Sequence, residues 1–482
     1  MKKHGQAASA LMLAGLTSLT LISVGSSGAS ATSSDRCPRI SAQSASPSTP
    51  SSTPPDRISS EQDFRRLSGL RADREYVEQL HASNEKSTAS GGASSAAQKA
   101  PASSQVLLTP AENAALAVQD ALAERARAAA AQHFLDYPDG GAGHFFDRAR
   151  GLFQVFVTGD AAGTVDALTP VTGREKLEVL LVENSEADLE AAREKIFALR
   201  DELGSQGTVY RSSQYDVREN CIVVTVTGDR LAADALLAQA VEPRLYAVVE
   251  GSGPQPLGAR GTTAPPLRGG AELVGYDSVC SNGFIAYRDT SPRTFFSIFA
   301  AHCTYVGDYI YNPGYDANRD GLRSTADALG RVDKREWRVG QTVNADAARF
   351  PIYVGLATND IITNPGYYRD ITSVEGRAGD ARGNLACQAG IMTGFDCGTI
   401  VDTSVDYCMD DDVSGYVCFD TGRKAEGLVG REGDSGGPVF YFNKAMGIVS
   451  SGDPISNGTT NNVIYSHIYD VTTSLDVKVV TY

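Results

Sequence analysis

Residues 431–440 read "REGDSGGPVF" and place one serine, Ser435, among glycines. Glycine adopts backbone conformations that strain other residues, so the chain around Ser435 can turn sharply. In such a turn the N–H groups of Gly433 and Ser435 can converge and form an oxyanion hole for a tetrahedral intermediate. A serine in a glycine-rich surface loop has the same local sequence, so the motif needs support from elsewhere in the chain.

A candidate base for Ser435 stands in "FAAHC", where His302 follows an apolar stretch and precedes Cys303. A serine hydroxyl is a weak nucleophile at neutral pH, so it needs a base within hydrogen-bond reach and a group that orients the base. After residue 270 the only other histidine is His467. A lone histidine beside a core strand is usually structural, and only its combination with the glycine-flanked serine indicates catalysis.

Together, "AAHC" and "GDSGG" resemble the motifs of chymotrypsin-fold serine proteases, and most of all the secreted bacterial streptogrisin and α-lytic protease group. The resemblance covers residues 266–482. It implies hydrolysis of peptide bonds through an acyl-enzyme, with Ser435 as nucleophile and His302 as general base. The orienting aspartate falls on Asp346 in "VNADAARF", and Asp360 in "ATNDII" is the alternative.

The resemblance also implies which residues meet the substrate. The oxyanion hole falls on Gly433 and Ser435. Ser450, Ser451 and Gly452 in "GIVSSGD" correspond to the strand that pairs with the substrate backbone.

Two features near Ser435 concern specificity and the serine turn. The family often carries a cysteine shortly before its serine, and "GLVGREGDSGG" has none. Side-chain specificity is therefore open, with an apolar or aromatic preference as the default expectation. The family buries the aspartate before its serine, here Asp434, against a cation or hydrogen-bond donors, and Arg431 is one candidate partner.

The N-terminus and the net charge indicate an exported protein. Residues 1–31 combine Lys2 and Lys3 with an apolar run and a small-residue end, as in a signal peptide. A membrane anchor is the alternative, but the run is short and interrupted. A net charge of −15 argues against nucleic acid as a partner. We expect an extracellular monomer that acts on polypeptides and has no membrane partner.

Export permits disulfides, and the chain has eight cysteines. No Cys-x-x-Cys pair indicates a metal site among them. The resemblance implies the bridges Cys280–Cys303 and Cys387–Cys397 and leaves Cys408–Cys418 as a further hairpin pair. Cys37 and Cys221 could bridge to each other or remain free.

Between the expected signal peptide and residue 266 the chain divides into two parts. Residues 32–105 are rich in Ser, Ala, Thr and Pro, which predicts a disordered leader with at most local helix. Residues 106–265 predict a small α+β domain, with strands at 177–183, 220–229 and 244–251 and a helix capped by Ser185. Its last residues, from 251, are rich in Gly and Pro and predict a cleavable linker. By resemblance, 106–265 is a propeptide that assists folding and blocks the active site.

Residues 266–482 contain short β-type runs between glycine turns, which predicts an all-β domain. The resemblance makes this two six-stranded antiparallel barrels. "DANRDGLRSTAD" places Asp316, Asn318, Asp320 and Asp327 at ligand positions of a calcium loop, with aspartate replacing the usual final glutamate. An acidic surface turn is the alternative. The expected chemistry requires no cofactor, so calcium would be structural.

Two other functions match parts of the pattern. A catalytically silent relative would bind proteins through the same barrel, although such relatives usually lose a catalytic residue, and here all three have candidates. A serine esterase matches Gly-x-Ser-x-Gly at residues 433–437. An esterase would use His467 as its base, because the histidine follows the serine in the esterase fold. Helices would also alternate with strands in that fold.

Overall fold

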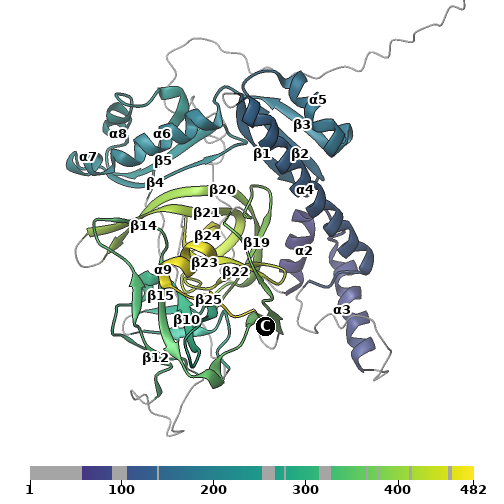
Figure 1. Cartoon of the computed structure of the whole chain (residues 1–482), viewed down its shortest axis with the longest axis vertical. Helices are drawn as coiled ribbons and strands as arrows, with labels where there is room; N and C mark the ends of the chain where they lie inside the picture. Colours follow the sequence, from purple (N-terminus) through teal and green to yellow (C-terminus); the bar gives the residue numbers. More distant parts are fainter. Residues whose placement is uncertain are drawn as a thin grey trace, which may run out of the picture. The chain divides into compact units, whose positions relative to one another are not determined.

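The computed structural model describes residues 57–89, 106–137, 140–251, 266–275, 278–313, 327–364, 367–377, 379–411, 415–453 and 459–481. Strands dominate after residue 266, whereas both helices and strands occur before it (Figure 1). Within these ranges, no helix combines the length and apolar character needed to cross a membrane. The expected signal peptide, 1–31, and most of the expected linker, 252–265, lie outside the described residues.

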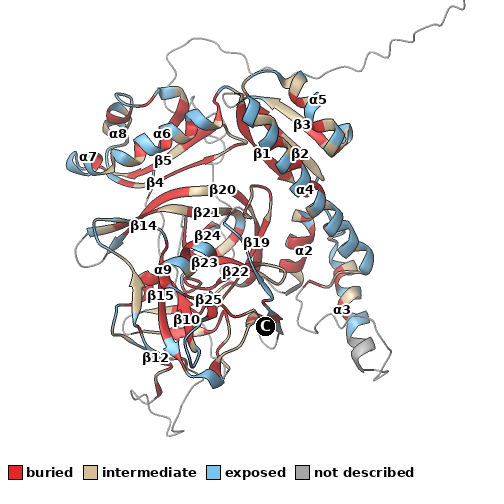
Figure 2. Cartoon of the chain, viewed as in Figure 1, coloured by how far each residue is buried: buried red, intermediate tan, exposed pale blue. Residues whose placement is uncertain are grey.

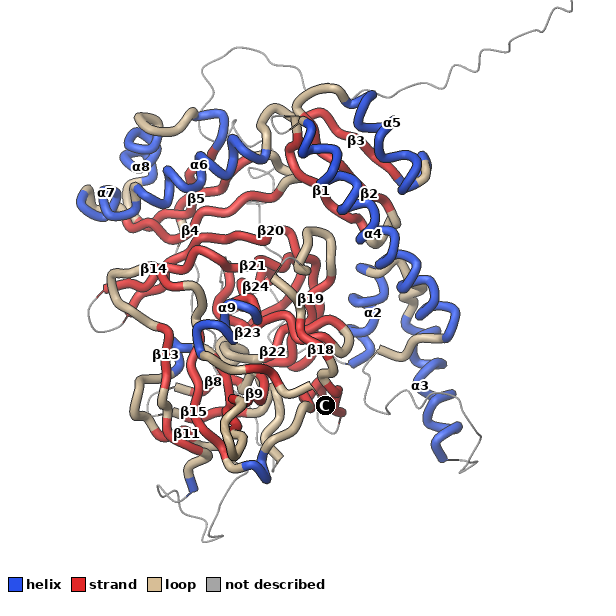
Figure 3. Tube along the Cα trace, in the orientation of Figure 1, coloured by secondary structure: helices blue, strands red, loops and turns tan. Residues whose placement is uncertain are grey.

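A closed barrel of six antiparallel strands lies at the centre of the β region (Figure 3). The strands are β19 (Leu385–Gly390), β20 (Gly394–Asp411), β21 (Gly415–Arg431), β22 (Pro438–Tyr441), β23 (Lys444–Gly452) and β24 (Thr459–His467). They pair in the order β19-β22-β23-β24-β21-β20, and β20 returns to β19 to close the ring. All six strands contribute to one buried apolar cluster that includes Ile400, Val439, Val449 and Tyr465.

A second group of strands forms a five-stranded sheet. Its order is β13 (Lys334–Glu336), β15 (Ala347–Ile352), β10 (Thr294–Phe299), β9 (Phe284–Arg288) and β25 (Lys478–Val479). The prediction of a mostly β region is confirmed. The second six-stranded barrel stays a prediction, because this sheet does not close within the described ranges.

Shorter strands and one helix complete the β region. They are β7 (Glu272–Val274), β8 (Val279–Ser281), β11 (Tyr309–Ile310), β12 (Gly330–Arg331), β14 (Thr342–Val343), β16 (Asp360–Asn364), β17 (Tyr367–Asp370), β18 (Ser373–Val374) and α9 (Ile468–Leu475). β7 pairs with β8, β11 with β12, and β16 with β17. β14 and β18 lie parallel to β21 and β23.

The region from residue 106 to 251 contains two small α+β units. The first consists of α4 (Pro110–Asp136), β1 (Gly141–Asp147), β2 (Leu152–Val157), α5 (Ala161–Thr172) and β3 (Leu177–Leu181). The second consists of α6 (Glu186–Ala198), α7 (Arg200–Ser205), β4 (Val209–Asp216), β5 (Cys221–Thr227), α8 (Arg230–Leu237) and β6 (Tyr246–Glu250). The side chain of Ser185 accepts a hydrogen bond from the Asp188 N–H, so α6 begins where the capping pattern predicts.

The second α+β unit continues the sheet of the barrel. β4 pairs with β5 and β5 with β6, and on its other side β4 pairs with β20. The register places Ser213 opposite Asp406 and Ser212 opposite Tyr407. The α+β region and the barrel are therefore joined by backbone hydrogen bonds.

Two helices lie within residues 32–105, where the composition predicts disorder with at most local helix. They are α2 (Arg57–Leu67) and α3 (Arg74–Ala89). Figure 2 shows buried residues along α2. The buried Arg65 pairs with Glu61 at 2.9 Å and with Glu112 at 2.6 Å, and Phe64 packs edge-on against Phe442. Buried ion pairs and one aromatic contact therefore order a segment that has little apolar sequence.

Candidate active site

His302 and Asp346 meet because their strands are neighbours. His302 lies in a short 3₁₀ turn, Ala301–Cys303, directly after β10, and Asp346 directly precedes β15. β10 and β15 are antiparallel, with Phe299 opposite Ala348, so both residues lie at one end of the sheet. His302 Nδ1 is 2.6 Å from Asp346 Oδ2. The N–H groups of Ala301 and His302 donate to Asp346 Oδ1 at 2.7 and 3.0 Å.

Ser450 of the barrel also holds Asp346, and Tyr407 holds Ser450. The Ser450 hydroxyl donates to Asp346 Oδ2 at 2.7 Å, and the Tyr407 hydroxyl donates to Ser450 Oγ at 2.8 Å. Burial alone would raise the pKa of Asp346, but the charge of His302 and the hydrogen bonds outweigh burial and lower this pKa. An ionised Asp346 keeps the proton of His302 on Nδ1, which leaves Nε2 as the basic nitrogen.

The basic nitrogen of His302 has no partner of its own. Nε2 is buried and makes no hydrogen bond within the part of the chain that the structure describes. The Ser435 hydroxyl is therefore not bonded to it in this structure. In the absence of substrate, the distance between a catalytic base and its nucleophile often exceeds hydrogen-bond length. The missing hydrogen bond at Nε2 is therefore compatible with a role as general base.

The turn of Ser435 packs against the end of β10. Gly433 and Gly436 have φ values of +98° and +81°, which side chains rarely tolerate. The Ser281 N–H donates to the Ser435 carbonyl at 2.8 Å. A Cβ at Gly436 would lie only 2.8 Å from the backbone nitrogen of Ala300, two residues before His302. Glycine at 436 thus permits the serine turn to approach the histidine turn.

Hydrogen bonds also connect the serine turn to Asp346. The Gly436 N–H donates to the Val449 carbonyl at 2.7 Å, and the Val449 N–H donates to the Gly437 carbonyl at 2.9 Å. Ser450 follows Val449 and bonds Asp346. Hydrogen bonds therefore connect the turn that contains Ser435, through the segment Val449–Ser450, to Asp346 and His302.

Asp434 stabilises the serine turn from inside. Its carboxylate accepts hydrogen bonds from the N–H groups of Met392 at 2.8 Å, Thr393 at 3.0 Å and Arg431 at 2.8 Å. The Thr393 hydroxyl is a fourth donor. Arg431, the expected partner, thus contributes a backbone N–H to this cluster. Burial raises the pKa of Asp434 despite these donors.

The expected substrate strand forms the end of β23. Ser450 and Ser451 are fully buried, and the Ser451 hydroxyl makes no hydrogen bond within the described ranges. Ser435 is also 0% exposed. Ser435 is therefore shielded from solvent in this structure.

Three disulfides join the cysteine pairs named from the sequence. Cys280–Cys303 ties β8 to the histidine turn, and the other two, Cys387–Cys397 and Cys408–Cys418, link directly opposed residues of β19–β20 and β20–β21. Cys37, the other half of the bridge considered for Cys221, lies outside the described residues.

The alternative residues lie in other environments. Asp360 is in β16 and pairs with Arg268 at 3.3 Å. His467 ends β24, accepts the Tyr469 N–H at 3.1 Å through Nδ1 and has Nε2 3.4 Å from Asp380. Asp360 therefore pairs with a cation, and His467 pairs with a carboxylate in the barrel.

Most of the calcium-like loop falls outside the described residues. Asp316, Asn318 and Asp320 are not among them, whereas Asp327 is described and is buried. The metal site remains a prediction from the sequence.

The comparisons with known proteins return solved structures of serine proteases. Thermobifida fusca protease A matches with 20% identity and a TM-score of 0.35, covering 45% of this chain and 99% of its own. Cellulomonas bogoriensis chymotrypsin matches with 20% identity and a TM-score of 0.34, with the same coverage. A glutamic acid-specific serine protease that uses a histidine triad in substrate binding matches with 19% identity and a TM-score of 0.35, covering 44% and 99%. No family model and no curated protein sequence matches the chain.

Sequence reasoning did not find Tyr407, Thr393 or Ser281. Each acts on a residue far along the chain, so local sequence carries no signal for the contact. Their positions beside Cys408, within the Cys387–Cys397 hairpin and beside Cys280 are the only clue, since disulfides mark rigid parts of the chain.

Proposed function

We propose that this chain is a serine endopeptidase exported as a latent precursor. The observation that carries the proposal is the 2.6 Å contact of His302 Nδ1 with Asp346 Oδ2, which leaves Nε2 without a hydrogen bond in the described part of the chain. The glycine turn of Ser435 packs against Ala300, two residues before His302. An oriented imidazole next to a glycine-flanked serine is the arrangement that nucleophilic acyl transfer requires.

The proposed reaction has two halves. Ser435 Oγ attacks the carbonyl carbon of the peptide while His302 Nε2 takes the hydroxyl proton and Asp346 stabilises the resulting imidazolium. The N–H groups of Gly433 and Ser435 stabilise the oxyanion. His302 then gives the proton to the leaving amine, and water releases the acyl group by the same route. Ser451 and Gly452 pair with the substrate backbone.

The burial of Ser435 and the pairing of β4 with β20 support the proposed latency. Residues 106–265 act as a propeptide that is cut away after folding. Residues 1–31 direct export, and the three disulfides fit an oxidising compartment. The processed enzyme acts as a monomer on polypeptides, without nucleic acid or membrane, and requires no cofactor; calcium, if it binds, is structural.

Labelling with a fluorophosphonate tests the nucleophile. The secreted, processed protein should be labelled, and Ser435→Ala should remove the label, whereas Ser373→Ala at an exposed serine should keep it. His302→Ala should abolish peptide hydrolysis. Hydrolysis that survives in His302→Ala would contradict the proposal. A cleavage profile on a peptide library and the N-terminal sequence of the secreted form define the specificity and the maturation bond.

Refolding tests the propeptide. The chain beginning at Gly269 should recover far less activity after denaturation than the full chain. Equal recovery would exclude a folding role for the preceding region.

A further inference from the structure

Carboxylates of the barrel meet arginines of the α+β region along β4. Three of the ion pairs that cross this boundary are Arg193 Nε to Asp406 at 3.2 Å, Arg211 Nη1 to Asp410 at 2.7 Å, and Arg218 Nη2 to Glu426 at 2.6 Å. In each pair the barrel supplies the acid. We call Asp406, Asp410, Glu426 and Asp453 the acidic row.

Asp453 extends the acidic row to the substrate strand, because it directly follows Gly452. Its carboxylate accepts hydrogen bonds from Gln214 Nε2 at 2.9 Å and Ser212 Oγ at 3.3 Å, both on β4. Burial raises the pKa of Asp453. If β4 leaves, water regains access to this carboxylate and favours its ionised form.

The backbone beneath the acidic row is a strand edge that β4 covers. β19 pairs with β20 from Gly394 to Thr399, and β4 pairs with the same edge at Asp406 and Tyr407. Removal of β4 therefore exposes unpaired N–H and C=O groups, to which another extended segment can add as a strand.

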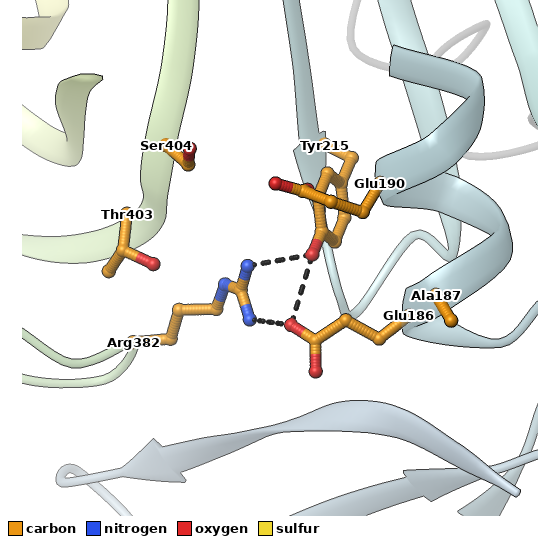
Figure 4. A pocket seen from close by; sticks show the side chains of 7 residues that line it. All are labelled: Glu186, Ala187, Glu190, Tyr215, Arg382, Thr403 and Ser404. Carbon is orange, nitrogen blue, oxygen red and sulfur yellow. Dashed lines mark hydrogen bonds and ion pairs between the residues drawn. The ribbon is translucent and has the colours of Figure 1, made fainter. Parts of the chain in front are cut away.

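A further ion pair across the boundary has the opposite polarity, because here the barrel region supplies the cation. Arg382 of the barrel region bonds Glu186 Oε1 at 2.5 Å and the Tyr215 hydroxyl at 2.9 Å (Figure 4). These residues line a pocket of about 400 Å³ together with Ala187, Glu190, Thr403 and Ser404.

We propose that loss of the α+β region turns the acidic row into a docking site for an arginine- or lysine-rich extended segment of the substrate. The segment adds to the β20 edge and places the adjoining peptide near Ser451 and Gly452. This inference rests on the proposed protease function and names its substrate class as basic polypeptides. The arginines of β4 and its neighbours show which side chains this surface accepts.

The charge of the acidic row determines which kinetic constants such docking would change. Attraction between a basic segment and several carboxylates raises the rate of encounter and is screened by salt. It acts away from the scissile bond, so it lowers KM and leaves kcat nearly unchanged.

Two members of the row can be replaced with little risk to folding. In the full chain the side chains of Asp410 and Glu426 are 58% and 43% exposed. Exposed ion pairs contribute little to stability. Asp410→Asn with Glu426→Gln therefore removes two charges from the row, and Asp289→Asn with Asp476→Asn removes two from exposed sites elsewhere.

The experiment uses processed enzyme obtained from the full chain. Two peptides share one cleavable sequence, and one carries a run of arginines where the other carries glutamines. The arginine peptide should show a kcat/KM about tenfold higher, mainly through KM, at low salt. High salt and the Asp410→Asn, Glu426→Gln variant should both reduce this difference, whereas the Asp289→Asn, Asp476→Asn control should keep it.

The outcomes separate the two proposals. Equal kcat/KM for both peptides in an active enzyme would overturn the docking site and leave the protease function intact. If no peptide is cleaved and no fluorophosphonate labels Ser435, the protease function fails. Fluorescence anisotropy of a labelled polyarginine then still tests the row on protein that has been cut in the linker and separated from the α+β region. Binding must be weaker in the Asp410→Asn, Glu426→Gln variant, and equal binding rejects the site.

Discussion

The Ser450 hydroxyl lies 2.7 Å from Asp346 Oδ2, the same oxygen that contacts His302 Nδ1. Ser450 belongs to the barrel, whereas His302 and Asp346 flank strands of the five-stranded sheet. A single carboxylate oxygen therefore connects the two β units at the candidate site.

Ser450→Ala should lower kcat about 10-fold, because a hydrogen bond to a charged group is lost inside the site. The pKa of Asp346 should rise, since one donor to its ionised form is removed. The pH profile of kcat measures this change. Tyr407→Phe, which removes the donor to Ser450, should have a smaller effect. An unchanged kcat in Ser450→Ala would show that the contacts with Ala301 and His302 are sufficient to hold Asp346.

Thr393→Val should destabilise the protein by about 1–3 kcal/mol, because the buried Asp434 carboxylate loses a donor. Urea unfolding measures the loss. Thr393→Ser is the matched control, since it keeps the hydroxyl and should stay close to wild type. If the serine and valine variants are equally stable, the hydroxyl contact does not stabilise the turn.

Two buried groups, His467 at the end of β24 and Asp380 before β19, should have opposite effects on the unfolding free energy as pH changes. Burial lowers the pKa of His467 to about 3, so its contribution is full above about 6.5 and is lost as pH falls toward 3. Burial raises the pKa of Asp380 to about 7, so its contribution is full below about 3.8 and is lost as pH rises to 7. Between about pH 4 and 6.5 the two effects should cancel.

Asp380→Asn should remove this cancellation. The unfolding free energy of the variant should fall by about 1.4 kcal/mol per pH unit, relative to wild type, as pH decreases from 6.5 to 4. Chemical denaturation at several pH values measures the slope. Adding His467→Gln to this variant should abolish the slope. If the unfolding free energy of Asp380→Asn depends on pH as that of wild type does, the opposing effects of His467 and Asp380 are contradicted.

Replacing both Cys408 and Cys418 by serine should cost about 2–3 kcal/mol, because the bridge closes a short loop between β20 and β21. The midpoint of urea unfolding measures the cost, and kcat at low temperature should change little. Replacing Cys280 and Cys303 should affect kcat as well, because Cys303 is adjacent to His302. Equal kinetic effects of the two pairs would contradict this distinction.

Millimolar calcium should raise the melting temperature of the protein if residues 316–327 bind the ion, because a ligand of the folded state stabilises it. Asp320→Asn should remove the rise, and magnesium should not replace calcium, since it favours smaller octahedral sites. A melting temperature that calcium leaves unchanged would identify the segment as an acidic turn.

The sequence predicted the features that depend on neighbouring residues. The apolar runs correspond to strands, as in β10 and β23, and Ser185 caps α6 as its spacing indicates. The motif resemblance selected His302 and Asp346, which the structure joins directly.

Features that depend on distant partners could not be predicted. Arg65 is buried because it pairs with Glu112, 47 residues away, and no composition window registers such a pair. Tyr407 reaches Ser450 across 43 residues. The open five-stranded sheet likewise depends on pairing between remote segments, which periodicity does not specify.

β20 presents one edge to two successive neighbours, β19 and then β4, while its other edge pairs with β21 throughout the barrel. Departure of β4 therefore leaves the ring of six strands closed. An uncovered strand edge invites pairing with an identical edge of another molecule. Carboxylates at Asp406 and Asp410 give both edges the same charge, so mutual repulsion would keep processed molecules from joining edge to edge and aggregating.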